Sequence, residues 1–287
     1  MGYLILACIV LLAVWTFGVE PRWLKIRKIS IKLSTTLKRP VTFLHISDSH
    51  FPLHLNTLRR FFDKLAVFEP DFVVYTGDII ESDDGVPHCV EALSKLKARV
   101  GKYAVLGNHD HYNYSAHDVM AFLFTLMGRF FCPTETNNVE KLKQALTGIG
   151  CRVLCNEAVR FDLEGETIYL IGLDDPVTRK ADPAKAFQDV NGKGIKILLT
   201  HSVDVMRKLD NYPVDLALGG HTHGGQILIP FYGPLPLKTH SRLGRKFIVG
   251  LNRYHHALTY TSRGIGEGKF FSFRFLCRPE AVLFEIT

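Results

Sequence analysis

The chain has 287 residues, of which 47% are hydrophobic and 22% charged, so a disordered, collagen-like or disulfide-stapled chain is excluded. That length suggests about two domains, although a single α/β domain can reach roughly 250 residues. The formal net charge is +7, and residues 1–40 hold seven basic residues against one acidic residue. The rest of the chain keeps 28 of the 35 basic and 27 of the 28 acidic groups, which is too nearly neutral for a nucleic-acid-binding protein.

Six cysteines are spread along the chain at positions 8, 89, 132, 151, 155 and 277. They form no CxxC pair and no regular framework, so we expect reduced thiols or small core residues. Such cysteine usage favours a reducing compartment.

The N-terminus holds the most apolar stretch, because Gly2–Val19 is eighteen consecutive residues without a charge. A helix of that length covers about 27 Å, just short of a bilayer core. Three interpretations are open: an uncleaved membrane anchor, a cleavable export signal and a buried helix. We favour the anchor, because no Lys or Arg precedes the run, no good cleavage site follows it, and a buried globular helix is rarely apolar on every face.

Seven basic residues follow this stretch before position 40. Lys and Arg just beyond a span favour the cytoplasmic side, and each adds roughly 1 kcal/mol of attraction to an anionic leaflet. We therefore expect a transmembrane or signal-anchor helix at 1–20 and a basic juxtamembrane linker at 21–40. The protein would lie at the inner, cytoplasmic membrane, single-pass or peripheral, with the body of the chain, residues 41–287, in the cytoplasm.

From residue 41 the chain alternates β-rich runs with amphipathic stretches. The first strands are expected at Val41–Ser47, Asp71–Thr76 and Lys102–Leu106, with helices at Leu55–Phe68 and Val86–Arg99 between them. Later strands are expected at Thr167–Leu173, Ile195–Thr200, Val214–Leu218, Ala257–Ser262 and Ala281–Glu285. Long apolar strands alternating with helices indicate an α/β fold whose sheet is covered on both faces.

Five polar clusters each follow a predicted strand directly. They are Asp48-Ser-His50, Gly77-Asp78, Gly107-Asn-His-Asp110, His201, and Gly220-His-Thr-His223. Each cluster alone is more easily interpreted as a turn or a structural histidine, but five of them at five strand ends are improbable by chance. In α/β sheets, chemistry gathers in the loops at the carboxyl ends of strands. We therefore expect these loops to build one metal site.

The donor set indicates which metals would bind. Seven side chains offer nitrogen and oxygen ligands and no thiolate: Asp48, His50, Asp78, Asn108, His201, His221 and His223. Such donors suit Mn, Fe or Zn, and seven are more than a tetrahedral zinc site uses. They fit two divalent ions that share a bridging carboxylate, the arrangement for in-line displacement at phosphorus. The chain has no GxSxG, HExxH, GxxxxGK[ST] or Cys-x5-Arg pattern for other chemistries.

The order DSH, GD, GNHD, H and GHTH resembles the calcineurin-like metallophosphoesterase superfamily, from about residue 41 to the end. The resemblance implies a four-layer α-β-β-α sandwich, here with an N-terminal membrane helix. One metal would be surrounded by Asp48, His50, Asp78 and His223, and the other by Asp78, Asn108, His201 and His221, with Asp78 bridging. The resemblance also implies that His109 donates a proton to the leaving-group oxygen and that Asp110 orients His109.

The GNHD, GHTHGGQ, SRGIG and CRPE segments are most similar to the membrane-associated YaeI/YkuE-like branch. Some members of that wider group hydrolyse UDP-2,3-diacylglucosamine in lipid A synthesis. The protein phosphatases of the superfamily continue the second motif as GDxxDRG, whereas this chain has GDIIESDDG and lacks the Arg. A phosphoprotein phosphatase is therefore disfavoured, and the acidic run Glu81, Asp83 and Asp84 is expected to be a solvated loop.

Residues 113–138 are expected to hold an apolar cap insertion after GNHD. Within them, 119–131 reads VMAFLFTLMGRFF, whose apolar side chains would cover most of a helix circumference. The stretch is either a helix buried against the body or a cap beside the metals. In the second case Phe122, Phe124, Phe130 and Phe131 would contact acyl chains or the bilayer surface.

These features together predict a membrane-anchored, two-metal phosphoesterase that hydrolyses a phosphodiester or pyrophosphate bond, with manganese as the expected metal. A lipid-linked substrate such as UDP-2,3-diacylglucosamine and an anionic leaflet are the expected partners, and nucleic acid is not. Two alternatives remain: an exported or general phosphodiesterase acting on soluble esters, and a non-catalytic membrane scaffold. The scaffold is disfavoured because all seven ligands and His109 are present.

Overall fold

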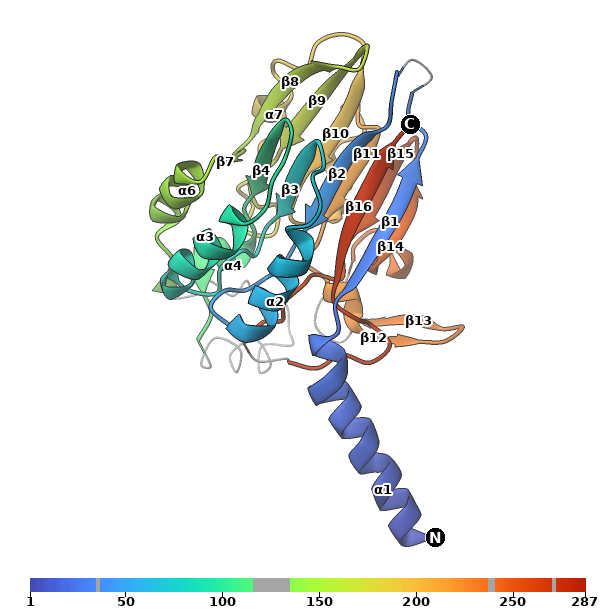
Figure 1. Cartoon of the computed structure of the whole chain (residues 1–287). Coiled ribbons are helices and arrows are strands. Elements are labelled where there is room, and N and C mark those ends of the chain that lie inside the picture. The colour runs from blue at the N-terminus through green and yellow to red at the C-terminus, as the bar shows by residue number, and fades with distance from the viewer. Residues whose placement is uncertain (35–36, 116–134, 237–240, 270–271) are drawn as a thin grey trace.

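The computed structural model describes residues 1–34, 37–115, 135–236, 241–269 and 272–287 (Figure 1). Most of the expected cap lies outside the described residues, and so do Phe122, Phe124, Phe130 and Phe131. Its two ends are described, because β5 (Tyr112–Asn113) pairs antiparallel with β6 (Glu135–Thr136). The five cysteines within the described ranges are free thiols.

Two six-stranded mixed sheets make up the body. The first has the order β1-β16-β2-β3-β4-β7: β1 (Lys25–Ile31), β16 (Glu280–Ile286), β2 (Val41–Ile46), β3 (Phe72–Thr76), β4 (Gly101–Val105) and β7 (Cys151–Val153). The second has the order β14-β15-β11-β10-β9-β8: β14 (Gly250–Tyr254), β15 (Ala257–Thr261), β11 (Leu216–Gly219), β10 (Ile195–Leu199), β9 (Glu166–Gly172) and β8 (Glu157–Leu163). Every strand expected from the apolar runs lies in one of these sheets, close to its predicted bounds.

The central strands are apolar on both faces because each face packs on a different layer. In β2, Phe43 faces the second sheet, whereas Leu44 faces a layer of helices. The aromatic ring of Phe43 stacks on that of Phe72 from β3, with ring centroids 4.7 Å apart. Burial on both faces explains why these strands read as continuous apolar runs.

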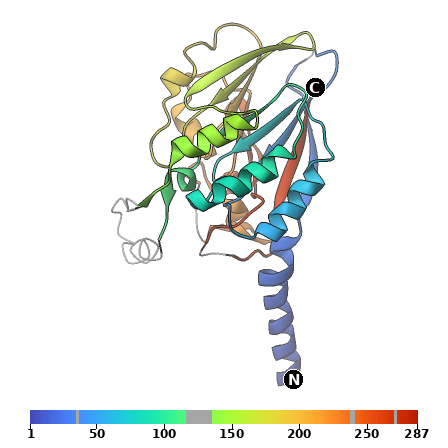
Figure 2. The ribbon, with the colours of Figure 1, turned by 60° about the vertical axis from the view of Figure 1, so that its left-hand side comes forward.

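Four layers result, as the resemblance implied. Helices α2 (Leu55–Leu65), α3 (Val86–Ser94) and α6 (Val139–Gly148) cover the outer face of the first sheet (Figures 1 and 2). On the outer face of the second sheet the cover is thinner. It includes the short helix α7 (Pro183–Ala186) and the 3-10 segment η4 (Val203–Lys208), which pack on a smaller apolar cluster.

The expected basic linker at 21–40 is wrong over Lys25–Ile31, which form β1. This strand pairs in parallel with β16 over its whole length, from Lys25 opposite Glu280 to Ile31 opposite Ile286. It is an edge strand, and edge strands commonly carry Lys and Arg on their exposed positions. That mixture of charge and isoleucine concealed the strand in the sequence. The edge strands β8 and β14 were not predicted either. They too are only partly buried, so their sequences mix polar and apolar residues.

The apolar N-terminal stretch forms α1 (Gly2–Ala13), which continues without interruption through a π-helical turn, 14–19, and a 3-10 turn, Glu20–Arg22. The helix projects from the body as a rod (Figure 1). It is long and apolar enough to cross a membrane, and none of its most apolar stretch is buried. The buried-helix interpretation is therefore wrong. A membrane anchor and a signal sequence both fit this helix.

Candidate metal centre

The predicted ligands lie in loops at one edge of the two sheets. Asp48 and His50 follow β2, Asp78 follows β3, and the short helix α4 (Asn108–His111) follows β4. From the second sheet, His201 follows β10, and His221 and His223 follow β11. Both sheets therefore contribute side chains to one cluster, as expected for the carboxyl ends of neighbouring strands.

The backbone of these loops is unusual. Five of the predicted ligands have left-handed φ angles between 48° and 72°: Asp48, His50, Asp78, His221 and His223. This conformation is uncommon for residues other than glycine, and it costs energy that the surrounding structure must supply. Glycine is required nearby, because a Cβ on Gly77 would lie 2.5 Å from Nδ1 of His201. Such concentrated strain is typical of a functional site.

The first group of donors consists of Asp48, His50 and His223, all buried. Nε2 of His50 lies 3.1 Å from Nε2 of His223, and Nε2 of His223 lies 3.8 Å from Oδ1 of Asp48. The Asp48 carboxylate also accepts the backbone amide of His221 at 2.9 Å, which joins this loop to the second sheet. Three donor atoms thus converge on one small volume.

The second group consists of Asp78, Asn108, His201 and His221. Nε2 of His201 lies 3.1 Å from Nδ1 of His221, 3.2 Å from Oδ1 of Asn108 and 3.3 Å from Oδ2 of Asp78. The Asn108 amide nitrogen donates to the hydroxyl of Tyr114 at 3.1 Å, which aims its oxygen at the cluster. Nδ1 of His201 faces the carbonyl oxygen of Thr76 at 3.0 Å, leaving Nε2 for the site.

Asp78 lies between the two groups. Its Oδ2 is 3.7 Å from Nε2 of His50 and 3.3 Å from Nε2 of His201, while its Oδ1 accepts the backbone amide of His109 at 2.9 Å. Burial disfavours both the Asp78 carboxylate and the His201 imidazolium, but their pairing lowers the pKa of Asp78 and raises that of His201 to about 10. These buried nitrogen and oxygen donors, without a thiolate, fit two divalent ions with one shared carboxylate.

His109 lies beside this cluster, and its partner is Glu81. Oε2 of Glu81 is 3.0 Å from Nδ1 of His109 and 2.8 Å from Nδ1 of His50. The expectation of a solvated acidic run is therefore wrong for Glu81, whose side chain is only 3% exposed. Burial disfavours the charged form, but His109 and His50 hold the pKa of Glu81 well below its usual range. Its place three residues after Asp78 was the available signal in the sequence.

Asp110, which is expected to orient His109, binds the backbone on both sides of that residue's loop. Its carboxylate accepts backbone amides from Gly107 at 2.9 Å, Ile79 at 2.8 Å and Ile80 at 2.9 Å. It therefore clamps the loop after β3 against the loop after β4. The His109 backbone is held instead by Asn137, whose side-chain amide donates to the His109 carbonyl oxygen at 2.8 Å.

A cavity of about 260 Å³ opens beside the second group, with His221 in its wall. Three basic side chains line it, those of Arg179, Lys208 and Arg242. Among the described lining residues Asp204 is the acidic one, and it already accepts the hydroxyl of Ser241 at 2.6 Å and the backbone amide of Arg242 at 2.8 Å. The cavity is therefore suited to an anionic group next to the metal ligands.

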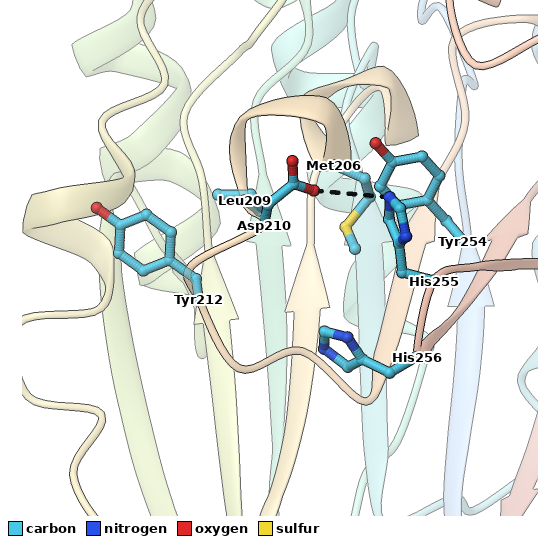
Figure 3. Close-up of a pocket in the computed structure, with 7 residues that line it drawn as sticks. All are labelled: Met206, Leu209, Asp210, Tyr212, Tyr254, His255 and His256. Atoms are coloured by element: carbon cyan, nitrogen blue, oxygen red, sulfur yellow. Dashed lines mark ion pairs between the residues drawn. The ribbon is translucent and has the colours of Figure 1, made fainter.

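Another cavity, of about 240 Å³, is lined by a different set of residues (Figure 3). Leu209 and Tyr212 line it just before β11, and Tyr254 and His255 line it at the turn before β15. It therefore opens at the amino ends of β11 and β15, whereas the metal ligands follow carboxyl ends. This cavity is not part of the metal centre.

The calcineurin-like phosphoesterase family matches residues 41–225. The chain is 30% identical to the uncharacterized metallophosphoesterase YkuE of Bacillus subtilis, over 85% of this chain and 78% of YkuE. It is 28% identical to the UDP-2,3-diacylglucosamine pyrophosphatase LpxG of Chlamydia trachomatis, over 97% and 94% of the two chains. It is 24% identical to the phosphodiesterase YaeI of Escherichia coli, over 93% and 90%.

Among solved structures, the phosphopantetheinyl hydrolase PptH of Mycobacterium tuberculosis aligns with a TM-score of 0.46 and 10% identity, over 82% of this chain and 95% of PptH. The family match covers most of the body, and it includes all seven candidate ligands together with His109. The chain therefore belongs to the calcineurin-like phosphoesterases and is a metal-dependent hydrolase.

Proposed function

We propose that the protein hydrolyses a phosphodiester or pyrophosphate bond of a lipid-linked substrate at the cytoplasmic face of a membrane, with manganese as its metal. The observation that carries this proposal is the position of the metal centre. It lies at the end of the body from which α1 projects, because β2, β3 and β4 all point toward that end (Figure 1). A bilayer that holds α1 would therefore lie next to the ligand-bearing loops.

The residues around the site would have separate roles in the reaction. Two divalent ions, when bound, supply Lewis-acid chemistry and neutralise charge on the phosphoryl oxygens. Asp78 would hold both ions, and Asn108 and His201 would help to hold the second. His109, whose Nδ1 lies beside Glu81, would give a proton from Nε2 to the departing oxygen. Glu81 stays anionic at neutral pH, so it stabilises the protonated ring of His109.

The N-terminal helix makes several hydrogen bonds to the body, which supports an uncleaved membrane anchor over a cleaved signal sequence. The Glu20 carboxylate is buried and accepts the indole N–H of Trp15 at 2.7 Å and the backbone amide of Leu276 at 2.9 Å. It also accepts the amide of Cys277, whose Sγ lies 3.4 Å from the carbonyl oxygen of His223. Removal of a leader through residue 20 would leave these buried amides without their acceptor, which is costly.

The basic cavity beside His221 supports a substrate with a second anionic group. A diphosphate carries one, whereas a simple diester does not. LpxG, which is similar over nearly the whole length of both chains, is a UDP-2,3-diacylglucosamine pyrophosphatase by name. UDP-2,3-diacylglucosamine combines a diphosphate with acyl chains, so it fits both the cavity and the membrane-facing site.

A substrate panel tests the proposal with full-length, manganese-loaded protein in detergent. It contains UDP-2,3-diacylglucosamine, a soluble nucleotide diphosphate ester, bis(p-nitrophenyl) phosphate and p-nitrophenyl phosphate. We expect the highest kcat/KM for the lipid-linked diphosphate. If bis(p-nitrophenyl) phosphate is the best substrate, the alternative of a general phosphodiesterase is correct, and YaeI is named as one. Absence of metal-dependent hydrolysis on every ester would contradict both.

A further inference from the structure

The hairpin that follows the GHTH motif carries an unusual tip. Strand β12 (Gln226–Ile229) pairs antiparallel with β13 (Gly233–Pro236), and the turn between them reads Pro-Phe-Tyr. Phe231 is fully exposed, Tyr232 is 54% exposed and Ile229 is 39% exposed. The amide of Tyr232 donates to the carbonyl oxygen of Ile229 at 3.2 Å, which makes Pro230 the second residue of a turn, a position that proline favours. The third position normally carries Gly or Asn, so turn formation does not explain Phe231 there.

Phe231 also adopts a left-handed backbone, with φ of 65°. A bulky residue in that conformation is strained, and an exposed phenyl ring gains nothing from the protein to offset the strain. Arg245 stacks on the neighbouring Tyr232, with its guanidinium 4.1 Å from the ring centroid. An aromatic tip beside a basic side chain is the composition found at membrane interfaces.

The hairpin is connected to the N-terminal helix through one segment of chain. Leu228 donates its amide to the carbonyl oxygen of Phe275, and Phe275 donates to Gln226, each at 2.9 Å. Arg274 in turn donates its amide to the carbonyl oxygen of Thr16 in the helix, at 3.0 Å. Figure 1 shows the hairpin extending sideways at the level where the helix enters the body.

Aromatic side chains mark the same level on the helix itself. Trp15 and Trp23 meet edge to face, with ring centroids 5.8 Å apart, and Trp23 is 47% exposed. Arg278 stacks on Trp23 at 3.7 Å from the ring centroid. Trp and Tyr gather where a bilayer meets water, so these rings place the interface near the junction of helix and body.

We propose that the hairpin tip, Ile229 to Tyr232, is a second membrane contact that inserts into the headgroup region of the bilayer holding α1. This inference rests on the anchor part of the proposed function. The hairpin begins three residues after the metal ligand His223. A tip held in the interface would therefore fix the distance and tilt of the metal centre relative to the lipid surface, which a single helix cannot do alone.

Photocrosslinking of the full-length protein tests this contact. Benzoylphenylalanine replaces Phe231 in one variant and Val67 in a matched control, which is also strongly exposed, at 74%, but lies beyond the end of α2 away from the metal centre. Both are reconstituted into vesicles of phosphatidylethanolamine and phosphatidylglycerol with radiolabelled phosphate. We expect labelled lipid adducts in the variant with benzoylphenylalanine at 231 and almost none in the variant with it at 67.

Three results would overturn the proposal: no lipid adduct at 231, equal adducts at both positions, or adducts at 231 only with a second copy of the chain. Metal-dependent hydrolysis of bis(p-nitrophenyl) phosphate by each variant shows that it is folded, and it tests the phosphoesterase separately. If the Phe231 variant is inactive, lipid crosslinking is measured with benzoylphenylalanine at Tyr232 instead. Co-sedimentation of both variants with the vesicles tests the membrane anchor separately from the contact at 231.

Discussion

Oε2 of Glu81 lies 3.0 Å from Nδ1 of His109, so a buried carboxylate supports the imidazole that we propose as the proton donor. The same oxygen lies 2.8 Å from Nδ1 of His50 in the first donor group. One side chain therefore lies against both a metal-ligand candidate and the proposed proton donor. Outer carboxylates of this kind fix the tautomer and ring orientation of the histidines that they contact.

Replacing Glu81 with Gln should lower kcat by about 10–100-fold, because both rings lose their anionic partner while the shape is kept. The alkaline limb of the pH–rate profile should move to lower pH, since the protonated form of His109 is less stabilised. Steady-state kinetics on bis(p-nitrophenyl) phosphate across pH measures both effects. Asp84→Asn, which removes a solvent-exposed charge nearby, is the control. An unchanged pH profile in Glu81→Gln would mean that Glu81 acts only on packing.

Replacing Asp78 with Ala should abolish binding of both metals, because its Oδ2 faces both donor groups. Replacing His109 with Ala should leave the metals bound and slow turnover by about 10²–10⁴-fold, the usual contribution of a general acid. Elemental analysis and kinetics on the same preparations measure the two outcomes. Equal metal content in Asp78→Ala and the wild-type protein would contradict the bridging assignment.

Neutralising the basic cavity should affect substrates unequally. The triple variant Arg179→Gln, Lys208→Gln, Arg242→Gln should lose kcat/KM on a nucleotide diphosphate ester by about tenfold or more, since each pairing with a phosphate is worth on the order of 1 kcal/mol even near the surface. Hydrolysis of bis(p-nitrophenyl) phosphate should change little. Lys193→Gln, an exposed cation away from this cavity, serves as the control. An equal loss of kcat/KM on both substrates would show that the cavity does not bind a second anionic group of the substrate.

Asp71 should contribute strongly to stability, and in a pH-dependent way. Its buried carboxylate accepts from Arg39 at 2.9 Å, from Arg99 at 3.0 Å and from the amide of Thr42 at 2.8 Å. Burial alone would raise the pKa of Asp71, but these donors hold it well below its usual range. Asp71→Asn should therefore cost about 1–3 kcal/mol at pH 7.

A depressed carboxyl pKa in the folded state means that this stabilisation is present above the unfolded pKa, about 3.9, and is lost as the pH falls through the folded value. The gap in unfolding free energy between wild type and Asp71→Asn should accordingly narrow below about pH 4. Denaturant unfolding at several pH values measures it. Asp63→Asn breaks an exposed pair with Lys95 and should change stability by less than about 1 kcal/mol. If the difference in unfolding free energy between wild type and Asp71→Asn stays constant with pH, the charge of the Asp71 carboxylate is not its cause.

Glu20→Ala should destabilise the junction of helix and body by about 1–2 kcal/mol, because the amides of Leu276 and Cys277 lose their acceptor. Glu20→Gln keeps one acceptor oxygen and should cost less. Hydrogen exchange of the two amides in detergent-solubilised protein follows the effect locally. If exchange at Leu276 and Cys277 is equally slow in Glu20→Ala, the connection does not depend on Glu20.

The central strands and the metal-ligand candidates could be predicted from local sequence patterns. The strands β2, β3 and β10 are apolar on both faces, so their runs stand out without knowledge of their neighbours. The end of such a run marks the carboxyl end of a strand, so polar residues directly after it lie at the carboxyl edge of the sheet. That is why the sequence alone predicts that Asp48, Asp78 and His201 lie close together.

The roles of Glu81, Asp110 and β1 depend on contacts between distant segments of the chain. The partners of Glu81 lie 28 and 31 residues away along the chain, so nothing in the acidic run shows that it is buried. Asp110 binds the amides of Ile79 and Ile80 because the loops after β3 and β4 meet, which depends on their parallel pairing. Lys25–Ile31 became a strand because β16, more than two hundred residues later, offers its edge. Burial and hydrogen-bond partners come from contacts between distant segments, and local patterns carry no record of them.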